Sequence, residues 1–148
     1  MIKAILQSDP KYVTTVEIDE HLLILDEPVS LGGNNQGPTP VNTVFAALSG
    51  CISMTLRMYA DRKKWPLERI EVTIENKVEP VQEDDPRFKE TPWKIHKGKV
   101  RFIHARVAVS GPLDQEQINR LDDIAGKCPV HVMLKQGSHI THETTLAS

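Results

Sequence analysis

Residues 37–57 read GPTPVNTVFAALSGCISMTLR, a proline- and glycine-containing start followed by a long stretch without a charged residue until Arg57. Four of its residues recur at the three- and four-residue spacing of one helical face: Val44, Leu48, Cys51 and Thr55. The sequence predicts a helix from Val41 to Trp65, which Pro66 ends. Because the helix lacks charge on every side over most of its length, we expect it to be buried.

The residues before this helix predict a β-hairpin and a loop. Alternating residues from Tyr12 to Ile18 and the apolar run from Leu22 to Leu25 flank Asp19-Glu20, as in two strands joined by a turn. The segment from Pro28 to Pro40 is rich in glycine and proline, so it predicts a loop that leads into the helix.

Two further strands are expected after the helix. Residues 70–78 alternate between apolar and polar side chains, which predicts a half-exposed strand. Residues 79–96 are polar and proline-rich and predict an exposed excursion. Residues 100–109 predict a second strand whose apolar phase shifts between Phe102 and Ala105. That shift indicates a β-bulge or a strand buried on both faces.

The C-terminal third predicts two helices and a last strand. Asp114 and Gln117 have the spacing of a capping box, which marks the start of a helix. Cys128-Pro129 predicts the start of a shorter helix, because proline suits the first helical position. Residues 138–146 predict a final strand. The mixture of strands and helices predicts an α+β fold.

The composition is that of an ordinary globular domain, with 148 residues, 39% hydrophobic, 26% charged, net charge −2 and pI about 6.3. The length predicts a single domain, residues 1–148. The slightly acidic balance argues against a nucleic-acid partner. The chain starts without a signal-peptide pattern, and no stretch is expected to span a bilayer. The expected location is therefore the cytoplasm, without membrane contact.

Cys51 and Cys128, the two cysteines, are the candidates for chemistry. In a reducing cytosol a cysteine pair is more often catalytic, redox-active or buried than a permanent disulfide. Cys128 stands at a helix start, where backbone N–H groups lower a thiol pKa, and His131 lies one turn further on. Cys51 lies within the apolar helix, where it needs a cation or hydrogen-bond donor from elsewhere in the fold to react.

Other interpretations of these residues stay open. Free cysteines often only fill space in a core, so each of the two could be structural. Cys128 and His131 have the spacing of half a zinc site, which His139 and His142 could complete. Residues three apart on a strand face opposite ways, however, which counts against that metal site. The spacing of Cys51 and Cys128 alone does not establish whether they meet.

Two motifs resemble the OsmC/Ohr family. The first is Gly37-Pro38-Thr39-Pro40 followed by Cys51 inside a helix of small residues. The second is Cys128-Pro129-Val130 at the start of a late helix, after the helix end Ile124-Ala125. The order of elements is also similar to the family: strands, a glycine-rich loop, the central helix, strands, a helix, Cys-Pro and a last strand. The resemblance covers nearly the whole chain.

The resemblance implies an OsmC-like fold, in which antiparallel sheets wrap around a long central helix in an intertwined homodimer. It implies a thiol-dependent peroxidase that reduces organic hydroperoxides. Cys51 would be the peroxidatic thiol that becomes a sulfenic acid, and Cys128 would resolve it as a disulfide for an external dithiol to reduce. No metal and no organic cofactor is implied.

The chain departs from the family where the peroxidases activate their first cysteine. They use an arginine from the N-terminal strands and a carboxylate just after the loop proline. Here Val41-Asn42-Thr43 follows Pro40, and no arginine precedes Arg57. The alternative function is therefore an OsmC-fold protein without peroxidase chemistry that binds a small apolar or acidic molecule.

Overall fold

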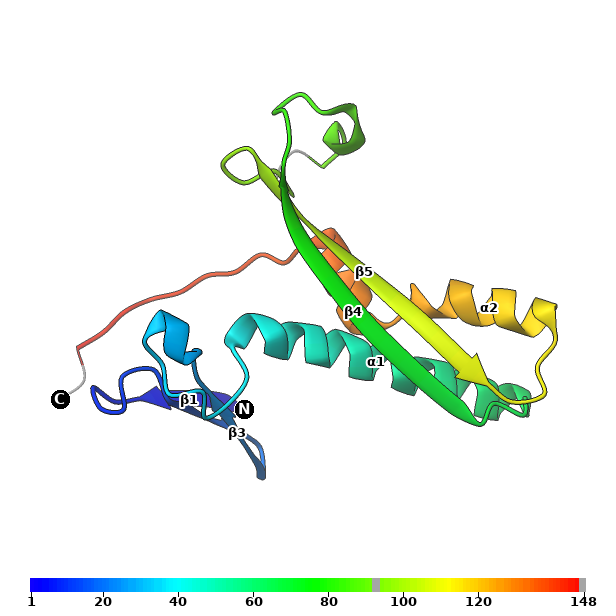
Figure 1. Cartoon of the computed structure of the whole chain (residues 1–148), viewed down its shortest axis with the longest axis horizontal. Coiled ribbons are helices and arrows are strands. Elements are labelled where there is room, and N and C mark those ends of the chain that lie inside the picture. Colours follow the sequence, from blue (N-terminus) through cyan, green and yellow to red (C-terminus); the bar gives the residue numbers. More distant parts are fainter. Residues whose placement is uncertain (92–93, 147–148) are drawn as a thin grey trace. The chain divides into compact units, whose positions relative to one another are not determined.

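The structure is a computed structural model that describes residues 1–91 and 94–146 (Figure 1). The chain divides into two compact units, Met1–Leu48 and Ser49–Ser148. The long helix α1 (Pro40–Lys63) contributes residues to both. The α+β class with antiparallel sheets and a long helix, predicted from the sequence, is confirmed.

The first unit contains a three-stranded antiparallel sheet. Its strands are β1 (Ile2–Leu6), β2 (Thr14–Ile18) and β3 (His21–Leu25), with β2 in the centre. The predicted hairpin is β2–β3, in which Ile18 pairs with His21 across the Asp19-Glu20 turn. Val16 on the central strand is the buried residue of this sheet.

The loop after β3 closes around a buried carboxylate, Asp26, whose side chain is only 1% exposed. Its Oδ1 accepts the N–H of Glu27 at 2.8 Å, and its Oδ2 accepts the N–H groups of Asn34 and Gln36 at 3.0 and 3.1 Å. A Cβ on Gly33 would lie 1.9 Å from the Glu27 carbonyl oxygen, so this close wrap needs glycine. The predicted loop is therefore an ordered structure, which includes the 3₁₀ turn Val29–Leu31.

This carboxylate should make the stability of the protein depend on pH. Burial by itself raises the pKa of Asp26, but hydrogen bonds from the three backbone N–H groups outweigh it, and the pKa lies below its ordinary value. A lowered folded-state pKa contributes stability above the unfolded-state pKa, and that contribution is lost as the pH falls through the folded-state value. We expect Asp26→Asn to be less stable than wild type at pH 7, with the difference shrinking below about pH 4.

Urea unfolding at pH 7 and pH 3 measures the effect, with Glu20→Gln, an exposed acid in the same unit, as the control. A difference between Asp26→Asn and wild type that stays constant over this pH range would contradict the expectation.

Helix α1 begins one residue before the predicted start. The Thr39 hydroxyl accepts the N–H of Asn42 at 3.2 Å, and Pro40 occupies the first helical turn, where its missing N–H does no harm. The helix ends at Lys63, and Arg62 and Lys63 in its last turn suit the negative end of the helix dipole.

The prediction that α1 is buried on every side is wrong for the single chain. Ile52 and Leu56 are almost completely buried, but Met54 and Met58 are 69% and 71% exposed. Met54 and Met58 lie four residues apart, so they form one apolar stripe on the surface of the second unit.

By length and composition alone, α1 is also apolar enough to cross a membrane, contrary to the sequence expectation. It has 24 residues and reaches a mean hydropathy of 1.2. Core helices of soluble proteins meet the same criterion. Because the buried Ile52 and Leu56 belong to the core of their unit, we interpret α1 as such a helix.

The second unit is built around a long two-stranded ribbon, β4 (Arg69–Pro80) and β5 (Lys99–Ser110). Figure 1 shows it as a twisted pair of arrows. The strands pair residue for residue from Arg69 with Ser110 to Pro80 with Lys99, so the predicted bulge is absent. The half-buried face nevertheless changes along β5, because residues 105, 107 and 109 are covered at one end and 100 and 102 at the other. We attribute this change of the covered face along β5 to the twist of the ribbon.

Two helices follow the ribbon. Helix α2 (Gln115–Ala125) begins with the predicted capping box, in which Asp114 accepts the N–H of Gln117 and the Gln117 side chain accepts the N–H of Asp114. Helix α3 (Pro129–Gln136) follows after a short turn. The predicted strand over residues 138–146 is wrong, because this segment is exposed and has no regular structure. A strand requires a neighbour to pair with, and no other strand pairs with it in the described part of the chain.

Candidate active site

Cys51 lies on α1, next to the best-buried part of that helix. Its neighbour Ile52 is 1% exposed, whereas Cys51 itself is only half-buried. The helix fixes the position of Cys51, and the residue stays partly in contact with solvent. The apolar pattern of the sequence predicted the helix, but it did not predict this difference between neighbouring residues.

Cys128 is completely buried and forms the N-cap of α3. Its Sγ accepts the backbone N–H of His131 at 3.3 Å, and Pro129 occupies the first helical position, as predicted. His131 therefore meets the cysteine through its main chain, whereas the sequence indicated only that it lies one turn away.

The structure brings the two cysteines together. Cys51 and Cys128 lie 3.4 Å apart, within the same compact unit, and both are free thiols. Sequence spacing could not establish this contact, because it depends on how α1 packs against the start of α3. The contact therefore places a half-buried and a fully buried thiol side by side.

The thiol of Cys128 differs from the sequence expectation. Burial raises its pKa, and the hydrogen bond and the charge of Cys51 raise the pKa further. The backbone N–H groups of His131 and Val130 lower it, but they do not outweigh these effects. The prediction that the helix start makes Cys128 a ready thiolate is therefore wrong, because complete burial dominates over the helix terminus.

The raised pKa has a consequence for the cysteine pair. Cys128 keeps its proton near neutral pH, so the neighbour of Cys51 is a neutral thiol. The local sequence pattern did not predict this state, since nothing in it indicates that Cys128 is buried.

Arg57, two turns after Cys51 on α1, is held away from any role in activating it. Its guanidinium donates to the carbonyl oxygens of Leu67 and Glu68, at 2.6 and 3.1 Å, and pairs with Asp61 at 3.5 Å. These contacts anchor the turn between α1 and β4.

The zinc hypothesis finds no support in the described ranges 1–91 and 94–146. No three His, Cys, Asp or Glu side chains gather there in a group that could hold a metal ion. His139 and His142, which would complete such a site, lie in the exposed segment after α3.

Residues 33–143 match the sequence model of a family described as OsmC-like protein. This chain belongs to the OsmC-like family. The match includes both cysteines and crosses the boundary between the two compact units. No curated protein matches the chain.

Solved structures of OsmC-like proteins share the fold. An organic hydroperoxide resistance protein OsmC from Legionella pneumophila is 19% identical, with a TM-score of 0.63 over 91% of this chain and 89% of that one. An OsmC-like protein from Mycoplasma pneumoniae is also 19% identical, with a TM-score of 0.65 over 91% and 86%. An organic hydroperoxide resistance protein from Elizabethkingia anophelis is 17% identical, with a TM-score of 0.58 over 90% and 87%. At these identities the likeness shows the fold.

Proposed function

We propose that this protein is a thiol-dependent peroxidase that reduces organic hydroperoxides through Cys51 and Cys128. The observation that carries the proposal is the contact of a half-buried and a fully buried thiol 3.4 Å apart. The names of the Legionella and Elizabethkingia proteins, which refer to organic hydroperoxide resistance, support the substrate class.

The difference in exposure between the two cysteines supports separate roles for them. A hydroperoxide from solution can reach only the half-buried Cys51, because Cys128 is 0% exposed. The Cys51 thiolate attacks one peroxide oxygen, so that an S–O bond forms and the O–O bond breaks. The products are a sulfenic acid on Cys51 and an alkoxide, which becomes the alcohol when it takes a proton.

The protonation state of Cys128 determines that the second step follows the first. Cys128 retains its proton until the alkoxide forms beside it, and loss of that proton to the alkoxide makes Cys128 a thiolate. This thiolate attacks the Cys51 sulfur, so the S–S bond forms, the S–O bond breaks and the hydroxide leaves as water after protonation. An external dithiol then reduces the disulfide by exchange and is itself oxidised. The cycle uses no metal and no organic cofactor.

The experiment is a thiol count on the wild-type chain. We expect one equivalent of cumene hydroperoxide to remove both free thiols and to give a Cys51–Cys128 disulfide in a peptide map, with one equivalent of cumyl alcohol formed. Dithiothreitol should restore both thiols. Thiols that remain unchanged after prolonged exposure would reject the peroxidase.

The same experiment tests the alternative, an OsmC-fold protein that binds a small molecule without peroxidase chemistry. The observation in its favour is that Arg57 is engaged by Leu67, Glu68 and Asp61, and that no arginine precedes it in the chain. Folded protein with inert thiols is the result that favours this alternative.

We also propose that the working form is a cytoplasmic homodimer of a single 1–148 domain. The exposed apolar stripe of Met54 and Met58 supports an interface on α1, since soluble chains usually cover such a surface. The family match over residues 33–143 supports a single domain.

A further inference from the structure

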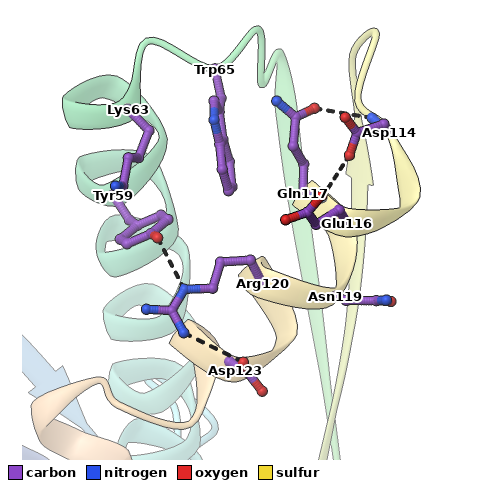
Figure 2. Close-up of a pocket in the computed structure, with 9 residues that line it drawn as sticks. All are labelled: Tyr59, Lys63, Trp65, Asp114, Glu116, Gln117, Asn119, Arg120 and Asp123. Atoms are coloured by element: carbon purple, nitrogen blue, oxygen red, sulfur yellow. Dashed lines mark hydrogen bonds and ion pairs between the residues drawn. The ribbon is translucent and has the colours of Figure 1, made fainter.

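A second site candidate is a cleft of about 570 Å³ that neither cysteine lines. It lies in the second unit, between the last turns of α1 and the first turns of α2 (Figure 2). Its volume is within the range of pockets that bind small ligands. Its residues come from separate elements, so no sequence motif marks it as a site.

One side of the cleft is held by Tyr59 and Arg120. The Arg120 Nε donates to the Tyr59 hydroxyl at 3.0 Å, and the guanidinium also pairs with Asp123 at 3.5 Å. Tyr59 is only 8% exposed, and its ring meets the ring of Trp65 edge to face, with the centroids 5.5 Å apart. These contacts hold the two aromatic rings in place. The Arg120 guanidinium already has partners in Tyr59 and Asp123, so it is not the free cation of the cleft.

Two opposite charges in the cleft remain without an ion pair in the described part of the chain. The Lys63 ammonium, on α1, lies 5.9 Å from the centroid of the Tyr59 ring and has no carboxylate partner. The Glu116 carboxylate, on α2, has no cationic partner either. The remaining acid near α2, Asp114, is occupied by the capping box.

Trp65 also lines the cleft. Figure 2 shows its ring between α1, which carries Lys63, and the side chains of α2. Within the described residues its indole N–H donates no hydrogen bond to the protein, and the residue is half-exposed. The cleft therefore offers a cation, an anion and an aromatic surface with a free donor.

We propose that this cleft binds a small zwitterion that carries an aromatic group, such as an aromatic α-amino acid. Its carboxylate meets Lys63, its ammonium meets Glu116, and its ring packs against Trp65. A ligand with one charge makes only one of the two ion pairs, and the lost charge-assisted contact lowers its affinity. The polarity of the walls thus selects for both charges together.

The probe is L-phenylalanine, followed through the indole N–H signal of Trp65 in ¹⁵N NMR spectra of the full-length protein. Trp65→Phe assigns that signal. We expect phenylalanine to shift it in a saturable way. Phenethylamine, which lacks the carboxylate, and 3-phenylpropionate, which lacks the ammonium, should each bind about ten-fold more weakly.

Two variants test which charge each wall supplies. Lys63→Met should remove the advantage of phenylalanine over phenethylamine, and Glu116→Gln should remove its advantage over 3-phenylpropionate. Lys64→Met and Asp122→Asn lose the same charges outside the cleft and should bind like wild type.

An unchanged indole signal at 10 mM phenylalanine, or equal affinity for all three compounds, would overturn the proposal. Cys51→Ser should bind phenylalanine as wild type does, so the outcome is independent of the peroxidase chemistry.

Discussion

Cys51→Ser is expected to abolish hydroperoxide reduction, whereas Cys128→Ser is expected to permit the reduction of one hydroperoxide molecule per chain. The asymmetry follows from exposure, because Cys51 is half-buried and Cys128 is completely buried 3.4 Å away. Without Cys51, no accessible thiolate meets the peroxide. Turnover should fall by about a hundred-fold or more, since the covalent route is lost.

Cys128→Ser removes the resolving thiol and leaves the attacking one. The first equivalent of cumene hydroperoxide should still be consumed, and Cys51 should accumulate as a sulfenic acid that dimedone traps as a mass increase on its peptide. Dithiol-dependent turnover should fall strongly. The first step should also be slower than in wild type, because a serine hydroxyl is a weaker acid than a cysteine thiol and protonates the alkoxide less readily.

The control is Thr55→Ser, one turn from Cys51 on the same face of α1, which keeps both thiols. It should retain the activity of wild type. Hydroperoxide consumption by Cys51→Ser at the wild-type rate, or trapping of a sulfenic acid on Cys128 in that variant, would show that the assigned roles are wrong.

Gly111→Ala is expected to cause the largest loss of stability among the glycine substitutions of the second unit. Gly111 lies between β5 and α2 with φ at +132°, a conformation that side chains disfavour. A Cβ there would lie 2.1 Å from the Pro66 carbonyl oxygen and 3.1 Å from the Glu68 nitrogen. That backbone cannot move freely, because Arg57 holds the Leu67 and Glu68 carbonyls. We expect a loss of about 3 kcal/mol or more in the free energy of unfolding.

The matched control is Gly98→Ala, which shares the positive φ but not the clash. Gly98 has φ at +68°, and the nearest atom to an added Cβ is the Val81 carbonyl oxygen at 3.9 Å. The conformational strain alone should cost about 1–2 kcal/mol. Urea unfolding of both variants separates the two contributions. Equal losses in the free energy of unfolding would mean that the backbone at Pro66 moves away from a Cβ at position 111.

Local signals in the sequence were sufficient for the elements that local interactions determine. The capping box of Asp114 and Gln117 and the proline after Cys128 both begin helices where predicted, because their bonding partners lie within one turn. The hairpin around Asp19-Glu20 was predictable for the same reason. The family resemblance, noticed from motifs around Cys51 and Cys128, was confirmed by the match over residues 33–143.

The predictions that failed depend on contacts between distant residues. The pKa of Cys128 was misjudged because its complete burial is set by packing that the Cys-Pro motif does not reveal. The phase shift between Phe102 and Ala105 had indicated a bulge or a strand buried on both faces, but the two strands pair without a bulge, and we attribute the shift to ribbon twist, which residue spacing does not reveal. Residues 138–146 have the pattern of a strand, but a strand also requires a partner.

The Cys128 sulfur caps helix α3 and, in the proposed cycle, also forms the disulfide, and these two roles compete. In the reduced chain it accepts the His131 N–H and so secures the first turn of α3. Forming the disulfide would draw the Cys128 sulfur to bonding distance of the Cys51 sulfur, about 2 Å, so in the proposed cycle oxidation would shift the sulfur and weaken the cap, and reduction would restore it. By thermodynamic linkage, whatever stability the cap gives α3 also favours the dithiol over the disulfide. The amide-exchange rate of His131 is then a reporter of the oxidation state of the protein.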